Sequence, residues 1–143
     1  MPTEPSLPAR LAAILSSFET LGSRGLDDLD ALYAPHVLFV DPIQQITSRA
    51  EFRLMNERLI ERCTYVRFED VTVIGEEPHF VATWKMSFKP RMGPEIRVHG
   101  ASEFRSEDGL VVYHRDYWDL LSSVMASVPV LGPVYQRVVA MLG

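Results

Sequence analysis

The sequence predicts an α+β domain in which a strongly curved antiparallel sheet packs on N-terminal helices, giving a cone-shaped fold. Apolar residues recur with a helical period in the first half of the chain and alternate with a period of two in the second half. Short turn-forming segments separate the alternating runs, so consecutive strands are expected to pair as hairpins. We expect a single domain over residues 1–143, with residues 1–6 flexible.

The first helix is expected at residues 7–21, because its apolar side chains share one face, Ser6 suits the N-cap and Gly22 ends the pattern. A short second helix is expected at about residues 26–33 and would end at Pro35.

A third helix is expected after Ser48, since Glu51 three residues later completes a capping-box signal. Its inward side chains would be Phe52, Met55, Leu59 and Ile60. Strands are expected at residues 37–41, 65–74, 80–88, 95–105 and 110–118.

Composition limits the function. The 143 residues carry 14 basic and 19 acidic side chains and no basic stripe, which argues against a nucleic-acid partner. The single cysteine, Cys63, excludes an internal disulfide and fits a reducing, cytoplasmic setting. The apolar stretch from Leu120 is broken by Pro129, Gly132 and Pro133, so no membrane span is expected. This tail is expected to cover a pocket or a partner subunit.

The inward faces of two predicted strands are aromatic and aliphatic. Trp84, Met86 and Phe88 share one such face, and Val98 and Gly100 share the other. A face of this kind lines either a pocket for a lipophilic small molecule or an ordinary core, and spacing does not separate the two.

The last predicted strand carries the most informative polar residues. Alternation places His114, Asp116 and Trp118 on one face. A carboxylate on a buried face is costly unless it is paired or used, so Asp116 is a candidate catalytic residue with His114 as its partner. Asp41, at the end of another apolar run, is a second candidate. The structural alternatives are a strand-end turn at Asp41 and an anchored carboxylate at Asp116.

No cofactor or metal is expected. The sequence has no glycine-rich phosphate loop. A metal site made of His99, His114 and Asp116 is not expected, because alternation places His99 on the opposite face of the sheet from the other two.

Several segments carry a family resemblance. The chain from the first helix to Trp118 resembles the nuclear transport factor 2-like superfamily, which includes ketosteroid isomerase, SnoaL-like polyketide cyclases and limonene epoxide hydrolase. The resemblance is carried by Leu32-Tyr33-Ala34-Pro35-His36, Val40-Asp41-Pro42, Asp108-Gly109-Leu110-Val111 and His114-Arg115-Asp116-Tyr117-Trp118-Asp119. It implies a homodimer formed through the outer sheet face, which would include Arg97, His99, Glu103, Tyr113, Arg115 and Tyr117.

Asp41-Pro42 resembles the segment that holds the general base of ketosteroid isomerase, where a carboxylate moves a proton between carbons next to a carbonyl. The tyrosine that donates to the enolate oxygen falls on Phe18, and the second acid falls on Gly100 or Ala101. These side chains cannot donate, and losing one such donor costs about 10² to 10³ in rate. Efficient steroid-type isomerisation is therefore not expected.

Asp116 resembles the aspartate that activates water in limonene epoxide hydrolase. The arginine and second acid of that triad fall on Trp84 and Met86, and the water-positioning pair falls on Phe39 and Asp41. The resemblance thus implies a base without its usual partners.

Two functions remain open. One is a cofactor-independent proton-transfer isomerase or cyclase acting on a small lipophilic molecule, and the other is a non-catalytic ligand-binding or dimeric assembly module of the same fold. In either case, the pocket-lining residues would be Phe18, Phe39, Trp84, Met86, Phe88, Val98, Gly100 and Trp118.

Overall fold

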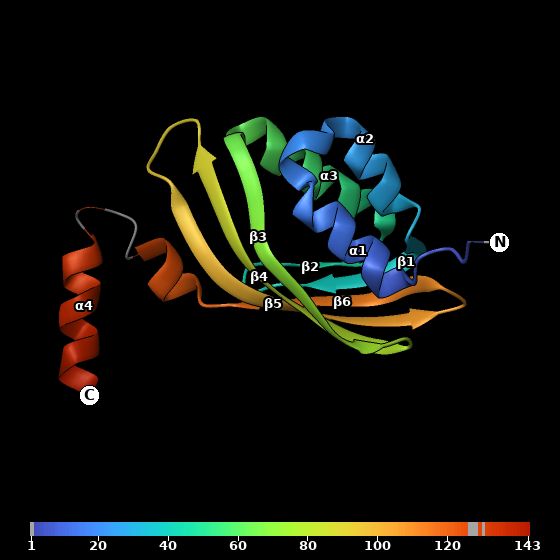
Figure 1. The fold of residues 1–143 in the computed structure, drawn as a ribbon. Helices are drawn as coiled ribbons and strands as arrows, with labels where there is room; N and C mark the ends of the chain where they lie inside the picture. Colours follow the sequence, from blue (N-terminus) through green and yellow to red (C-terminus); the bar gives the residue numbers. More distant parts are fainter. Residues whose placement is uncertain (1, 126–128, 130) are drawn as a thin grey trace.

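The computed structural model describes residues 2–125, 129 and 131–143. Three helices pack on the face toward which a six-stranded sheet curves (Figure 1). The strand order is β2-β1-β6-β5-β4-β3. The helices are α1 (Leu7–Ser16), α2 (Phe18–Asp30) and α3 (Arg49–Arg62). The strands are β1 (Tyr33–Val40), β2 (Gln45–Ile46), β3 (Cys63–Glu76), β4 (His79–Pro90), β5 (Ile96–Glu107) and β6 (Leu110–Trp118).

The predicted α+β architecture is confirmed, and β3 to β6 pair antiparallel in chain order as expected. The pairing of β1 with β6 is parallel and was not predicted. Short turn-forming segments indicate pairing only between strands that are consecutive in the chain. A parallel pair needs a long connection and therefore leaves no such signal. The pairing matters for the site because it sets Phe39 of β1 opposite His114 of β6.

The predicted helix boundaries need two corrections. The first helix ends at Ser16, and α2 then runs from Phe18 to Asp30 through a bend at Gly22, whose φ is 56°. Gly22 is non-helical, with φ 56° and ψ −139°, and divides α2 into two helical segments, so the predicted break at Gly22 is confirmed; glycine tolerates this positive φ without steric cost. The predicted helix at residues 26–33 ends before Tyr33, which opens β1, and Pro35 lies inside that strand. Proline is tolerated there because the β1–β6 register shifts between Tyr33 and Leu38.

Both predicted N-caps are confirmed. The Ser6 hydroxyl accepts from the Ala9 amide at 3.3 Å, and the Ser48 hydroxyl accepts from the Glu51 amide at 3.2 Å. The second cap fixes where α3 begins, and α3 supplies one wall of the space between the helices and the sheet.

The core lies between the sheet and the three helices. Phe80 of β4 stacks on Phe104 of β5 with ring centroids 5.0 Å apart. Leu11 of α1, Leu32 before β1 and Val111 of β6 are also buried in this layer. The core closes the end of the cone near the β5–β6 turn and leaves the space nearer Trp118 for the cavity described below.

The apolar tail forms two helical pieces, a π-helix η1 (Leu121–Met125) and α4 (Leu131–Leu142). Helix α4 stands apart from α1 to α3 (Figure 1) and exposes Val134, Val138 and Met141. No described residue of the tail lines the cavity, so the expectation that the tail covers the pocket fails for the described part. Coverage of a partner subunit stays a prediction.

None of the helices formed by the described residues has the length and hydropathy that crossing a membrane requires.

The placement of the core predicts a contrast between two leucines. Leu32 is 2% exposed and Leu54 on α3 is 43% exposed. Leu32→Ala is expected to lower the free energy of unfolding by about 2–5 kcal/mol, because it leaves a cavity in the core. The matched change Leu54→Ala is expected to cost less than about 0.5 kcal/mol. Urea unfolding measures both, and equal losses would contradict this core.

Candidate functional site

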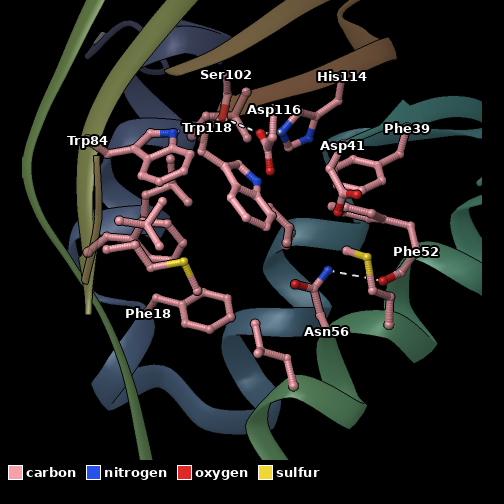
Figure 2. Close-up of a pocket in the computed structure, with 18 of the residues that line it drawn as sticks. Phe18, Phe39, Asp41, Phe52, Asn56, Trp84, Ser102, His114, Asp116 and Trp118 are labelled. Carbon is pink, nitrogen blue, oxygen red and sulfur yellow. Dashed lines mark hydrogen bonds and ion pairs between the residues drawn. The ribbon is translucent and has the colours of Figure 1, made fainter. Parts of the chain in front are cut away.

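A cavity of about 330 Å³ lies between the concave face of the sheet and helices α1 to α3. Its wall is largely aromatic and aliphatic, with a small polar group on the β5–β6 side (Figure 2). The polar side chains on the wall are Tyr33, Asp41, Gln44, Asn56, Trp84, Ser102, His114, Asp116 and Trp118.

Strand alternation and register bring the polar group together. His114, Asp116 and Trp118 share the inward face of β6, as predicted, because alternate residues of a strand point the same way. The antiparallel register with β5 sets Ser102 directly opposite Asp116. The register between β5 and β4 sets Ala82 opposite Ser102. Trp84 lies two residues further along β4, on the same face as Ala82, and its side chain extends into the site.

These residues form one continuous chain of hydrogen bonds. The Trp84 indole Nε1–H donates to Ser102 Oγ at 2.9 Å, and the Ser102 hydroxyl donates to Asp116 Oδ1 at 2.5 Å. His114 Nε2 lies 2.6 Å from the same Oδ1, and the Tyr33 hydroxyl lies 2.9 Å from His114 Nδ1.

The chemistry of each group sets the direction of the chain. An indole N–H only donates, so Ser102 Oγ accepts from Trp84 and turns its own hydrogen toward Asp116. An ionised carboxylate only accepts, so His114 Nε2 carries a proton and donates it. In the neutral imidazole, Nδ1 is then an acceptor, and Tyr33 donates to it. Two donors therefore converge on Asp116 Oδ1.

Tyr33 is suited to the donor role. Its side chain is 1% exposed. Burial raises the pKa of the Tyr33 hydroxyl well above its usual value, and the negative charge of Asp116 raises it further. The hydroxyl thus keeps its proton and remains available to His114 Nδ1.

Asp116 Oδ2 is the free end of this chain. It has no hydrogen-bond partner among the described residues, and its side chain is 21% exposed. Figure 2 shows the carboxylate turned into the cavity, with the Asn56 side chain on the opposite wall. The Asn56 amide Nδ2 donates to the Phe52 carbonyl at 3.0 Å, and Oδ1 of Asn56 has no partner in the described part of the chain. The arrangement offers open oxygen acceptors to anything in the cavity.

Asp41 lies on the same wall but is engaged differently. Its Oδ1 accepts from the backbone amides of Ile43 at 2.7 Å and Gln44 at 2.9 Å, and its Oδ2 accepts from Gln44 Nε2 at 3.2 Å. This is the strand-end turn weighed from the sequence. Both carboxylate oxygens of Asp41 therefore stabilise the loop after β1.

The structure places the sequence candidates as follows. Asp41, His114 and Asp116 all lie on the cavity wall, together with every predicted lining residue except Gly100. Gly100 lies beneath the Trp84 indole, and a Cβ at this position would collide with the ring. Its missing side chain makes room for Trp84, so the prediction that Gly100 lines the pocket is corrected.

Four polar residues of the cavity wall were missed, namely Tyr33, Gln44, Asn56 and Ser102. Gln44 lies in the loop after β1, where strand alternation gives no signal. Ser102 falls on the inward face by alternation, and Asn56 follows Phe52 by one helical turn on the predicted inward face of α3, so both had a signal. Tyr33 had none, because the sequence placed it at the end of a helix.

Comparison with protein families gives one match. Residues 14–114 match the SnoaL-like domain, which spans more than half of the chain. The protein is therefore a SnoaL-like domain of the nuclear transport factor 2-like superfamily. Comparison with curated proteins gives no significant match.

Solved structures agree on the fold. A putative polyketide cyclase from Pseudomonas putida is similar with a TM-score of 0.72 and 14% identity, over 87% of this chain and 99% of that one. A hypothetical protein with a ketosteroid isomerase-like fold from Catenulispora acidiphila, solved in complex with trimethylamine, is similar with a TM-score of 0.69 and 20% identity, over 87% of this chain and 93% of that one. An LEH-like epoxide hydrolase from M. tuberculosis is similar with a TM-score of 0.65 and 17% identity, over 93% of this chain and 97% of that one. At these identities the likeness shows the fold alone.

The assigned direction of the hydrogen-bond chain predicts the effect of removing the Tyr33 hydroxyl, where the chain begins. Tyr33→Phe is expected to lower the free energy of unfolding by about 1–3 kcal/mol, because it leaves His114 Nδ1 as a buried acceptor without a donor. Tyr65→Phe is the matched control, since the Tyr65 hydroxyl has no hydrogen bond among the described residues and should change little. Urea unfolding measures both, and ¹⁵N NMR of the imidazole should show the Nε2–H form in the unaltered protein. An Nδ1–H form would contradict the assigned direction.

Proposed function

We propose that the cavity binds a small lipophilic molecule and that Asp116 acts on it as the general base of a cofactor-independent proton transfer. One observation carries the proposal. Asp116 Oδ1 is held by Ser102 and His114, while Oδ2 faces an apolar cavity with no partner among the described residues. A base fixed in this way is positioned to take a proton from a molecule in the cavity.

The proposed reaction needs no co-reactant. Asp116 Oδ2 takes a proton from a carbon next to a carbonyl, and the electron pair of the broken C–H bond moves into the enolate. The resulting carboxylic acid returns the proton to a different carbon of the same molecule, which restores Asp116. Ser102 and His114 keep the carboxyl in place throughout by their bonds to Oδ1.

The enolate oxygen needs a hydrogen-bond donor. The Trp118 indole N–H has no partner among the described residues and lies two residues along the same inward face as Asp116. It takes the donor role in this proposal, and His114 orients the base. Asp41 shapes the loop at the cavity wall and does not act as the base.

The alternative function is a non-catalytic module that binds a ligand in the same cavity or assembles as a dimer. It is favoured by the engagement of both Asp41 oxygens in the loop and by the scarcity of free donors on the described cavity wall, where only the Trp118 indole N–H and the second amide N–H of Asn56 have no partner. The trimethylamine complex of the similar Catenulispora acidiphila protein supports binding of a small molecule.

The outer sheet face supports a homodimer. His79 Nε2 lies 2.6 Å from Glu103 Oε2, and the Tyr117 hydroxyl donates to Glu103 Oε1 at 2.9 Å. These contacts, first with His79 and then with Tyr117, lower the pKa of the Glu103 carboxyl and keep it charged. A face that mixes ordered charges with tyrosines suits an interface.

The buried Cys63 thiol, whose pKa is raised by burial, is consistent with the reducing cytoplasm that we propose.

Deuterium incorporation tests the catalytic proposal. The protein is incubated in D₂O with cyclohexanone and with 3-cyclohexen-1-one, and exchange at the carbon next to the carbonyl is followed by NMR. Asp116→Asn is expected to slow exchange by about 10²- to 10⁴-fold, because the base is lost.

Asp41→Asn is the comparison for that experiment. Its amide oxygen still accepts from the loop amides, so exchange should stay within about tenfold of the unaltered protein. Loss of exchange with Asp41→Asn alone would move the base to Asp41. Saturable binding of the ketones without any exchange would contradict this proton transfer and favour the binding module.

A further inference from the structure

The charges around the cavity all have one sign. Among the described residues that line it, Asp41 and Asp116 are acidic, His114 is the one histidine, and there is no lysine or arginine. Arg115 borders an adjoining surface hollow, where its guanidinium lies over the Tyr117 ring, 5.3 Å from the centroid, and Arg49 Nη1 donates to the backbone carbonyl of Tyr33 at 3.1 Å. An anionic ligand would therefore enter the cavity without a cation to pair with it.

The free hydrogen-bonding groups point the same way. The donors Tyr33, Ser102 and Trp84 are committed to the chain that ends at Asp116. Among the described residues, the free acceptors on the wall include Asp116 Oδ2 and Oδ1 of Asn56, a side chain only 8% exposed, while the free donors are the Trp118 indole N–H and the second amide N–H of Asn56. A ligand that fits these acceptors must bring N–H or O–H donors of its own.

The aromatic wall is compatible with positive charge. Phe39 and Phe52 lie with ring centroids 5.1 Å apart, and both rings border the cavity beside His114. Phe68 and Trp84 meet edge to face on another part of the wall, with centroids 5.5 Å apart. Aromatic faces attract ammonium groups, most strongly where water is excluded.

We propose that this cavity selects its ligand by charge and takes a small lipophilic amine, bound as an ammonium ion whose N–H groups donate to Asp116 Oδ2 and Asn56 Oδ1. The proposal rests on the ligand binding proposed above and does not require turnover. A negatively charged ligand of the same shape is excluded, because it would oppose Asp116 and leave both acceptors without donors.

The test compares three probes with one cyclohexyl skeleton: cyclohexylmethylamine, cyclohexylmethanol and cyclohexanecarboxylate, each at neutral pH. Binding is measured by calorimetry and by intrinsic fluorescence, since both tryptophans of the chain lie on the cavity wall. The amine is expected to bind about tenfold to a hundredfold more tightly than the alcohol, and the carboxylate is expected not to bind measurably.

Asp116→Asn assigns the selection to its residue. It is expected to lower the affinity for the amine by about tenfold or more and to keep the affinity for the alcohol within about threefold of the unaltered protein. Binding of the alcohol therefore also shows that the cavity is intact. Asp70→Asn is the matched control, because Asp70 is exposed, pairs with Lys85 outside the cavity, and has a φ of 52° that asparagine tolerates. It removes the same charge and should change neither affinity.

The outcomes separate this proposal from the catalytic one. Equal affinity for amine and alcohol, tighter binding of the carboxylate, or binding of none of the three overturns it, whether or not ketones exchange deuterium. The expected rank order in the unaltered protein supports it even if no exchange is found. Amine selectivity that survives Asp116→Asn would contradict the assignment to Asp116.

Discussion

The structure depends on a carboxylate held at an inward position of the central strand β6. A charged group removed from water must find donors, and Asp116 finds them in Ser102 of the neighbouring strand β5 and in His114 of β6 itself. Tyr33, His114, Ser102 and Trp84 belong to β1, β6, β5 and β4, which are adjacent in that order in the sheet. A one-residue shift in the register of any two of these strands would turn one of the four side chains to the outer face of the sheet. The chain of hydrogen bonds would then be broken. The same hydrogen bonds therefore tie the register of four strands to the geometry of the site.

Asp41, just after β1, and Asp116, inside β6, have different roles because of their neighbours. Asp41 is followed by Pro42, and its side chain accepts from the amides of the turn that results. Asp116 lies inside β6, where the backbone amides belong to the ladders with β1 and β5, so only side chains can pair with it. Resemblance to ketosteroid isomerase gives Asp41 the role of base, whereas the hydrogen bonds of this chain favour Asp116.

Much of the site was predictable because it is built on strands. Alternation alone placed His114, Asp116 and Trp118 on one face, and the hairpin turns aligned β3 to β6 in the right order. What could not be predicted comes from non-local pairing. Tyr33 reaches His114 only because β1 joins the sheet parallel to β6, and no local pattern signals such a pair. The role of Gly100, which leaves space for the Trp84 indole, could not be predicted either. Strand alternation marks Gly100 only as an inward position and does not show which side chain covers it.

The proposed base and the proposed charge selection share one atom, Asp116 Oδ2. An unpaired acceptor in an apolar cavity penalises every ligand that cannot donate to it, since binding would displace water without replacing its hydrogen bond. Selection for a donor thus follows from the same exposure that makes the carboxylate able to take a proton. An ammonium ligand would satisfy Oδ2 and hold it, which gives a binding module. A neutral ketone would leave Oδ2 free to attack a C–H bond, which gives a catalyst. The wall is common to both functions, and the chemistry of the occupant decides between them.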